Sequence, residues 1–261
     1  MHPADKTVII TGASSGIGAA TAQAFAAAGA NVVLAARDEA RLAAVAGAMA
    51  GRTLVAPTDV SDRRAIQRLV AETVAAFGGI DIVINNAGVG LAAPVAEMNT
   101  DDFEQALAVD LLGPLAITQA ALPHMQREGG QLIYVSSVVA LRALPYLGGY
   151  AAAKAALDRL TEALRVELRG SGITVTLVRP GTTSTGFSQN RLGSGRERRR
   201  VNARAATPEQ VARAILKAAV REPRVAYVSL ADQLALTFSL LAPQLTDWIL
   251  GRAFEWRAGH E

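Results

Sequence analysis

Residues 7–18 read Thr-Val-Ile-Ile-Thr-Gly-Ala-Ser-Ser-Gly-Ile-Gly, and this stretch decides the fold. Its first five residues are β-branched and mostly apolar, which is typical of a strand buried in a parallel sheet. Glycines at 12, 16 and 18 then make a tight turn, and an alanine-rich helical pattern follows. A helix N-terminus that follows a glycine turn attracts anions, because its backbone N–H groups are unpaired and its dipole is positive there. The stretch therefore predicts a pyrophosphate site for a dinucleotide.

The rest of the chain repeats the alternation of strand and helix. Seven short apolar runs predict strands at 7–11, 31–36, 52–57, 80–85, 131–136, 173–178 and 225–228. Helical patterns lie between them at about 17–29, 38–50, 62–77, 101–126, 150–169 and 208–221, the last with Thr207 as N-cap and Pro208 as first helical residue. This order predicts an α/β fold with a mainly parallel, seven-stranded sheet covered by helices on both faces.

The length of 261 residues and a hydrophobic content of 51% fit one domain over residues 1–261. Two segments depart from the alternation. Residues 181–207 are rich in Gly, Ser, Thr, Asn and Arg, and predict either a lid over the substrate or a flexible insertion. Residues 230–255 form an apolar C-terminal extension that polar residues and Pro243 interrupt, so they do not predict a membrane span. A helical hairpin at the site or at a subunit contact is the simpler interpretation, and contact with a membrane surface is the alternative.

Composition excludes several kinds of site. The chain has no cysteine, so no disulfide framework or thiolate nucleophile exists, and we expect a cytoplasmic protein. The first predicted strand begins at residue 7, so we expect no leader peptide ahead of the fold. The net charge of +3 comes with one basic run at 196–200 and no interleaved aromatic residues, so we expect no nucleic-acid partner. The three histidines are scattered, and we expect no metal site.

Three residues further along carry groups that move protons. Ser137 ends the fifth strand run, and Tyr150 and Lys154 stand four apart on the following helix. Residues four apart share one helix face, so the phenol and the ammonium lie together. A phenol titrates near pH 10 and is a poor base at neutral pH, but a nearby positive charge favours its anion. The trio therefore predicts proton transfer at a carbonyl or carbinol oxygen.

The glycine turn, Asn85-Asn-Ala-Gly88 and Tyr150-x-x-x-Lys154 together resemble the short-chain dehydrogenase/reductase family, over about residues 5–228. The glycines are spaced G-x-x-x-G-x-G, unlike the commoner G-x-G-x-x-G. The resemblance implies a single-domain Rossmann fold, a nicotinamide cofactor, and reversible oxidation of an alcohol to a ketone or aldehyde. It also implies that Tyr150 exchanges the proton, that Ser137 hydrogen-bonds the substrate oxygen, and that Lys154 binds the ribose and acidifies Tyr150.

The same resemblance names the residues that hold the cofactor. Asp59 and Val60 look like the family's adenine-binding pair, and Arg179-Pro-Gly181 with Thr185 looks like its nicotinamide-side loop. Asn85, Ala87 and Gly88 look like its support for the fourth strand and the cofactor. The complete predicted set is Gly12, Ser14, Ser15, Gly16, Ile17, Gly18, Arg37, Asp59, Val60, Asn86, Ala87, Gly88, Tyr150, Lys154, Pro180, Gly181 and Thr185.

One position departs from the family pattern. Members of the family carry an asparagine as fourth catalytic residue on the helix after the fourth strand, and this chain has Asp110 there. An ionised carboxylate near Lys154 would oppose the acidification of Tyr150. We therefore expect an active enzyme whose pH profile for alcohol oxidation is shifted upward. A cofactor-binding regulatory or scaffold protein without turnover is the alternative.

The end of the second strand selects the cofactor. An Asp or Glu there binds the ribose 2′-hydroxyl of NAD and repels the 2′-phosphate of NADP. This chain has Ala36-Arg37 instead, and a guanidinium binds a phosphate with charge-assisted hydrogen bonds. We predict NADP(H) in preference to NAD(H), while Asp38 keeps dual specificity open.

The segments expected around the substrate are mainly apolar, at 91–95, 138–147 and 187–192. They predict a small hydrophobic carbonyl or alcohol substrate, and the arginines at 191–200 leave an anionic carrier such as an acyl thioester as the alternative. The helix at 151–168 is apolar on more than one face, which predicts a subunit contact. Family dimers and tetramers commonly pair this helix with that of 101–126, so we expect a homodimer or homotetramer.

Overall fold

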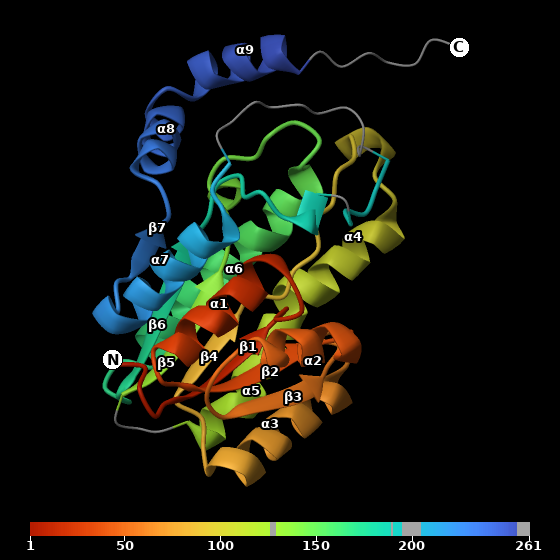
Figure 1. The fold of residues 1–261 in the computed structure, drawn as a ribbon. Coiled ribbons are helices and arrows are strands. Elements are labelled where there is room, and N and C mark those ends of the chain that lie inside the picture. Colours follow the sequence, from red (N-terminus) through yellow and green to blue (C-terminus); the bar gives the residue numbers. More distant parts are fainter. Residues whose placement is uncertain (126–128, 189, 195–204, 255–261) are drawn as a thin grey trace.

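Seven strands form one sheet in the computed structural model, which describes residues 1–125, 129–188, 190–194 and 205–254. The strands are β1 Thr7–Thr11, β2 Asn31–Ala36, β3 Thr53–Pro57, β4 Ile82–Asn85, β5 Gly130–Val135, β6 Ile173–Arg179 and β7 Val225–Tyr227. Their order is β3-β2-β1-β4-β5-β6-β7, and every neighbouring pair is parallel (Figure 1). The predicted seven-stranded α/β fold is therefore confirmed.

The central strand β1 explains why its sequence is apolar at every position. All of its residues are buried, and it pairs with β2 on one side and β4 on the other. Ile9 and Ile10 point to opposite faces of the sheet and enter two separate cores. A parallel strand that is covered on both faces needs apolar side chains throughout.

Helices cover both faces of the sheet (Figure 1). Phe25 and Ile215 pack into the core on one face, and Leu69, Ile117 and Leu157 pack into the core on the other. The first face is covered by α1 (Gly16–Ala27), α2 (Glu39–Gly47) and α7 (Pro208–Arg221), and the second by α3 (Arg63–Phe77), α5 (Gly113–Ala121) and α6 (Gly148–Glu167). The predicted start of α7 is confirmed, since Thr207 and Gln210 form a capping box.

The helix predicted over 101–126 is helical throughout Thr100–His124, but it contains a π turn that the sequence did not predict. The structure has α4 (Thr100–Leu107), a π turn (Ala108–Leu112), α5, and a 3₁₀ turn (Leu122–His124). Pro114 has no N–H to donate one turn back, and the N–H of Gly113 bonds instead to Ala108, five residues earlier. The π turn contains Asp110, so this change in helical pitch shapes the candidate site.

Isolated bridges pair the two ends of the predicted lid with each other and its middle with the loop after β4. Thr183 forms a bridge with Ala206, and Leu192 forms one with Leu91. A 3₁₀ turn spans Gly186–Ser188 between them. Residues 189 and 195–204 of the predicted lid lie outside the described part of the chain.

The C-terminal extension folds as two helices, α8 (Leu230–Leu241) and α9 (Pro243–Ala253), which stand beyond the carboxyl ends of the strands (Figure 1). The chain bends by 112° between the two helices. Arg142 forms an ion pair with Asp247 of α9, and the ring of Tyr146 lies 6.4 Å from that of Phe254. The extension therefore rests on the loop between β5 and α6.

Within the described residues, one helix has the length and composition of a membrane span, and a bent pair of helices would count as a second. An 18-residue window of the helix Thr100–His124 has a mean hydropathy of 1.4, but Ile117 and Ala121 are fully buried in a core of the sheet. The pair α8 and α9 meets the same criterion only if the bend between them is ignored.

Candidate active site

The predicted proton-transfer residues come together at the carboxyl ends of β4 and β5. Ser137 lies two residues after the end of β5, and its hydroxyl accepts a hydrogen bond from the N–H of Val139 at 3.3 Å. Tyr150 lies in the first turn of α6, within hydrogen-bond reach of Ser137. Lys154 follows one turn later, with its Nζ 5.9 Å from the centre of the Tyr150 ring. The structure thus assembles the trio that the spacing predicted.

Asp110 joins this group from the π turn. Its Oδ1 lies 2.9 Å from Lys154 Nζ, and the two side chains are 0% and 4% exposed. Its Oδ2 accepts a hydrogen bond from the N–H of Val89 at 3.2 Å, and Lys154 also donates to the carbonyl of Val135 at 3.2 Å. Asp110 is therefore an ion-pair partner of Lys154, a role that an asparagine cannot fill.

Gly88 makes room for that ion pair. A Cβ atom at this position would lie 2.7 Å from Asp110 Oδ1 and 3.5 Å from Lys154 Nζ. Any other residue would displace the carboxylate, since real Cβ contacts are longer than 3.0 Å. The glycine of the Asn-Asn-Ala-Gly motif is needed here for its small size.

Burial and charge act in opposite directions on these groups. Burial raises the pKa of Asp110, against the effect of Lys154. Burial alone would lower the pKa of Lys154, but the Asp110 carboxylate raises it above its usual value. Burial also raises the pKa of Tyr150; Lys154, Arg191 and a hydrogen bond with Ser137 oppose this, and Asp110 adds to it. With all these groups acting together, the pKa of Tyr150 lies above its usual value, so the phenol is protonated at neutral pH.

The glycine turn fits a pyrophosphate. Gly12 and Gly16 have φ angles of +66° and +53°, which residues with side chains rarely adopt. A Cβ atom at Gly18 would lie 2.1 Å from the carbonyl oxygen of Gly12. Ser15, the N-cap of α1, makes no side-chain capping bond, and the first turn contains no acid. The N–H groups at this end of α1, near Ser14 and Ile17, are thus available to an anion.

The other predicted cofactor loops lie against this turn. Asn86 Nδ2 donates to the carbonyl of Thr11 at 2.9 Å, and the N–H groups of Asn86 and Ala87 donate to the Thr11 hydroxyl at 3.0 and 2.9 Å. Across the turn, Thr185 Cγ2 would be 3.2 Å from a Cβ atom at Gly16. The glycine turn, the segment of Asn86 and Ala87, and the loop of Thr185 thus meet, and the Asn86 side chain holds the backbone of the glycine turn in place.

The nicotinamide-side loop contacts α8. A Cβ atom at Gly181 would lie 2.4 Å from a carboxylate oxygen of Asp232. Gly181 and the neighbouring Pro180 therefore lie between the end of β6 and the C-terminal extension. Burial raises the pKa of Asp232.

The end of β2 presents positive charge. Arg37 is exposed directly after β2. Asp38, the residue that kept dual cofactor specificity open, caps α2 by accepting from the N–H of Arg41 at 3.0 Å, and it pairs with the Arg41 side chain at 3.2 Å. Asp59 lies near Arg37: burial would raise its pKa, but hydrogen bonds from Ser61 and the charge of Arg37 lower it. Val60 beside it is buried.

A buried polar network behind the trio was not predicted. Asp158 is 0% exposed and accepts from Ser136 at 2.5 Å and from Arg179 at 2.8 and 3.1 Å. Arg179 donates further to the hydroxyl of Tyr227 at 3.2 Å. The network joins the strand end before Ser137, the helix that carries Lys154, and the strand end before Pro180. The sequence offered one sign of this network, because Asp158 stands four residues after Lys154 and therefore on the same helix face.

Apolar side chains surround the phenol on the substrate side. Ala92, Val139, Leu147 and Ala151 form a small core, and Val138, Leu144 and Tyr150 pack against it. The ring of Phe187 lies 5.7 Å from that of Tyr150. The three segments predicted to surround the substrate therefore do converge on Tyr150. Arg142 lies in one of these predicted segments, but its side chain forms an ion pair with Asp247 of α9.

Comparisons with known proteins agree with this geometry. A sequence profile described as short chain dehydrogenase matches residues 6–194. The chain is 34% identical to a dehydrogenase/reductase SDR family protein 7-like from Anopheles gambiae, over 97% of this chain and 84% of that protein. It is also 34% identical to an uncharacterized oxidoreductase of Staphylococcus aureus, over 85% of this chain and 94% of that protein.

Solved structures with the same fold contain either nicotinamide cofactor. A short-chain dehydrogenase/reductase from Burkholderia phymatum in complex with NAD has a TM-score of 0.84 at 25% identity, covering 94% of this chain and 96% of that one. A short-chain dehydrogenase from Burkholderia cenocepacia in complex with NADP has a TM-score of 0.82 at 26% identity, covering 96% and 99%. From the profile match and the relatives, together with the assembled site, we conclude that this chain belongs to the short-chain dehydrogenase/reductase family.

Proposed function

We propose that this protein is an NADP-dependent oxidoreductase that interconverts a hydrophobic secondary alcohol and its ketone or aldehyde, with Tyr150 as general acid and base. The arrangement of Ser137, Tyr150 and Lys154 beside the glycine turn supports this proposal most strongly. The phenol faces an apolar wall where a carbonyl group is protected from water.

The chain's own groups suit the proton half of the reaction. When bound, the nicotinamide supplies or accepts the hydride. In alcohol oxidation Ser137 donates a hydrogen bond to the substrate oxygen, and ionised Tyr150 takes the hydroxyl proton as the carbon loses its hydride. In reduction the neutral phenol gives that proton back. Lys154 would hold the ribose and favour the phenolate by its charge, less effectively because Asp110 shares that charge.

The preference for NADP rests on the end of β2. The 2′-phosphate would meet the exposed guanidinium of Arg37, with Arg41 nearby, whereas the carboxylate of Asp38 is engaged by α2 and Arg41. A charge-assisted hydrogen bond of this kind is worth about 1.5–3 kcal/mol, or roughly one to two decades of preference.

Substituting Arg37 tests the cofactor preference. Arg37→Ala should lower kcat/KM for NADPH about tenfold or more and leave that for NADH nearly unchanged. Arg213→Ala, on the exposed side of α7, is the matched control. A wild-type enzyme that prefers NADH would show the assignment to be wrong.

The apolar wall around Tyr150 supports a hydrophobic substrate. A panel of lipid-like, steroid-like and aromatic ketones, followed by NADPH absorbance in both reaction directions, tests the whole proposal. Turnover should fall about 10²- to 10⁴-fold in Tyr150→Phe, because the proton donor is lost while the ring remains. Binding of NADPH without turnover on any substrate would favour the alternative of a cofactor-binding regulatory protein, since Asp110 reduces the positive charge that Tyr150 experiences.

A further inference from the structure

The side chain of Ser136 is held in the interior next to the candidate active site. Ser136 is 4% exposed, and its hydroxyl donates to Asp158 Oδ1 at 2.5 Å. Its N–H donates to the carbonyl of Val178 at 2.9 Å, which continues the pairing of β5 with β6 beyond the end of β5. Both the side chain and the backbone of Ser136 are therefore tied to neighbouring elements.

The tether of Ser136 determines which way Ser137 points. The backbone at Ser137 is extended, with φ and ψ angles of −157° and 157°. Successive side chains of an extended chain point to opposite sides. Because the Ser136 hydroxyl is bound on one side, the Ser137 hydroxyl points to the other, within hydrogen-bond reach of Tyr150. A rotation of the chain at Ser136 would turn both hydroxyls together.

Asp158 joins Ser136 to the end of β6. Its Oδ2 accepts from Arg179 Nη2 at 2.8 Å and from Arg179 Nε at 3.1 Å, and the two side chains are 1% and 6% exposed. Arg179 Nη1 donates in turn to the hydroxyl of Tyr227, its parallel partner on β7, at 3.2 Å. One carboxylate on α6 therefore receives groups from two strand ends, one turn after Lys154.

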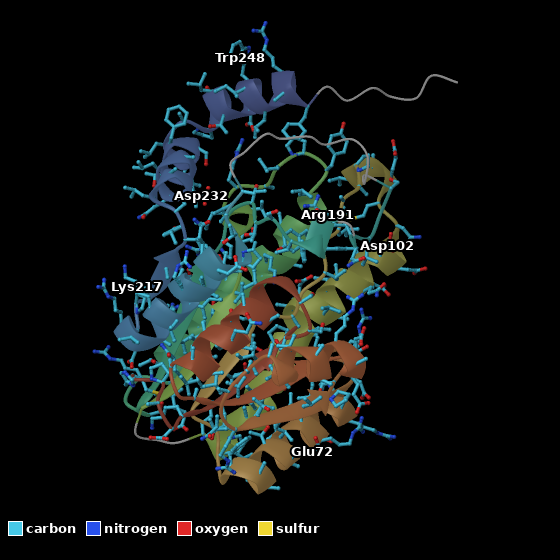
Figure 2. The ribbon with its side chains drawn as sticks, in the orientation of Figure 1. Glu72, Asp102, Arg191, Lys217, Asp232 and Trp248 are labelled. Atoms are coloured by element: carbon cyan, nitrogen blue, oxygen red, sulfur yellow. The ribbon has the colours of Figure 1, made fainter. Side chains whose placement is uncertain are left out.

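The end of β6 leads into the predicted nicotinamide-side loop. Pro180 and Gly181 follow β6 at once, and the carbonyl of Pro180 accepts from the N–H of Val138 at 3.1 Å. On the far side of the loop, a Cβ atom at Gly181 would lie 2.4 Å from a carboxylate oxygen of Asp232. Figure 2 shows Asp232 at the start of α8, beyond the carboxyl ends of the strands. The loop is thus held between the segment after β5 and α8.

The buried pair of Asp158 and Arg179 directs groups more than it stabilises the fold. Both charges lose water on burial, so an apolar pair of the same size would often stabilise the protein equally well. A charge-assisted hydrogen bond adds geometric specificity as well as energy. Asp158 uses its two oxygens on two different strand ends, which fixes the separation between the segment of Ser137 and the nicotinamide-side loop.

We propose that Ser136 and Asp158 are positioning residues, which orient the Ser137 hydroxyl toward the substrate oxygen and hold it at a fixed separation from the nicotinamide-side loop. The inference rests on the proposed role of Ser137 as hydrogen-bond donor to that oxygen. Catalysis is sensitive to such placement, because a displacement of about 1 Å can lower a rate about 10²-fold. Both residues act through groups that touch the substrate or the cofactor.

A double-mutant cycle tests whether Ser136 acts through Ser137. Ser136→Ala should lower kcat for ketone reduction about tenfold and leave the Kd for NADPH nearly unchanged, because the glycine turn stays intact. In a Ser137→Ala background the same change should lower kcat less than about twofold, because the hydroxyl that it would misplace is already missing. Thr73→Val is the matched control and should leave kcat unchanged, since it removes a buried hydroxyl of α3 that donates to the carbonyl of Leu69 at 2.7 Å.

Asp158→Asn tests the other positioning residue. The variant keeps the shape of the side chain but loses the charge that binds Arg179, so kcat should fall by up to about 10²-fold. Asp81→Asn is the matched control, because Asp81 also forms an ion pair, with Lys6 at 3.1 Å, ahead of the first residue of β4. It should leave kcat unchanged at a temperature where both variants are folded.

Hydrogen exchange provides a measurement that does not depend on turnover. The N–H of Val138 donates to the carbonyl of Pro180, and the N–H of Val139 donates to the Ser137 hydroxyl. If Ser136 holds this segment, both N–H groups should exchange about tenfold faster in Ser136→Ala and at the wild-type rate in the threonine control.

Three results would each overturn the inference. It fails if kcat is unchanged in Ser136→Ala or Asp158→Asn, if Ser136→Ala has an equally large effect in the Ser137→Ala background, or if the exchange of the two N–H groups is unchanged. A failure of the proposed function looks different: no ketone would be turned over, while exchange would still be faster in Ser136→Ala and the positioning of Ser137 would stand.

Discussion

The ammonium of Lys154 and the carboxylate of Asp110 lie 2.9 Å apart, and both side chains are buried. Burial makes the pair costly to break, because removing one partner leaves an unpaired charge in the interior. The carboxylate also lowers the net positive charge next to Tyr150. The ion pair therefore holds Lys154 in place, and it also makes the Tyr150 phenol harder to ionise.

Asp110→Asn should shift the pH dependence of alcohol oxidation downward. The carboxylate raises the pKa of Tyr150, after the larger effect of burial, so removing its charge lowers that pKa and the phenolate forms at lower pH. We expect kcat/KM at neutral pH to rise by up to about tenfold. The pH profile of kcat/KM is the measurement, and Asp101→Asn on the exposed side of α4 is the control. An unchanged profile would show that Asp110 does not influence Tyr150.

The same variant should be less stable. Asparagine leaves Lys154 with the carbonyl of Val135 as its hydrogen-bond acceptor but without a compensating charge. Breaking a buried ion pair in this way costs about 3–5 kcal/mol, and the similar shape of asparagine places the cost near the lower limit. Urea unfolding at neutral pH measures it.

Gly18→Ala should weaken cofactor binding. The added methyl would lie 2.1 Å from the Gly12 carbonyl oxygen and 2.7 Å from Asn86 Nδ2, so the turn must open. We expect the Kd for NADPH to rise at least about tenfold, because the backbone N–H groups lose their common direction. Fluorescence titration of NADPH measures this. Gly47→Ala is the matched control, since nothing lies within 4 Å of its added methyl; an equal effect of both changes would exclude the steric explanation.

The network around Asp158 predicts an order of stabilities. Asp158→Asn leaves the buried guanidinium of Arg179 without a charged partner and should cost about 3–5 kcal/mol. Ser136→Ala removes one hydrogen bond while the Asp158–Arg179 pair remains, and should cost about 1 kcal/mol. Urea unfolding of both variants decides the matter, and equal losses would mean that the ion pair contributes little.

Exposed apolar side chains on α6 support a subunit contact. Leu160 is 40% and Val166 is 71% exposed, although α6 already buries another face against the sheet. We expect a homodimer or homotetramer in light scattering at micromolar concentration, and dissociation when both residues are replaced by arginine. Val220→Arg, at a 48% exposed position on α7, is the control. A monomeric wild type would refute the prediction.

The sequence predicted the parts of the fold that depend on local pattern. The runs around Ile9 and Val33 are buried on both faces, so their composition identified them as central strands of a parallel sheet. The π turn at 108–112 was missed because its alanine and leucine residues suit an α-helix equally well. Pro114 was the local sign, but a proline alone does not distinguish a π turn from the first turn of a new helix.

Some contacts of the candidate site could be predicted from local sequence spacing, and others could not. Tyr150 and Lys154 could be paired from their helical spacing, whereas the ion pair of Lys154 with Asp110 joins residues 44 positions apart and follows from the fold. The placement of Leu192 beside the loop after β4 depends on a bridge between residues 91 and 192, which no local pattern encodes. Long-range contacts of this kind assemble the surroundings of Tyr150.

The missing side chain at Gly88 also limits how this site can change during evolution. A methyl at position 88 and a carboxylate at position 110 exclude each other, because they would be 2.7 Å apart. Close relatives with alanine at 88 should therefore carry a shorter residue than aspartate at 110, so that the two positions covary. An enlargement of Gly88 alone would displace the Asp110 carboxylate and its partner Lys154, whereas a change from aspartate to asparagine at 110 adds no heavy atom and is sterically the easier of the two.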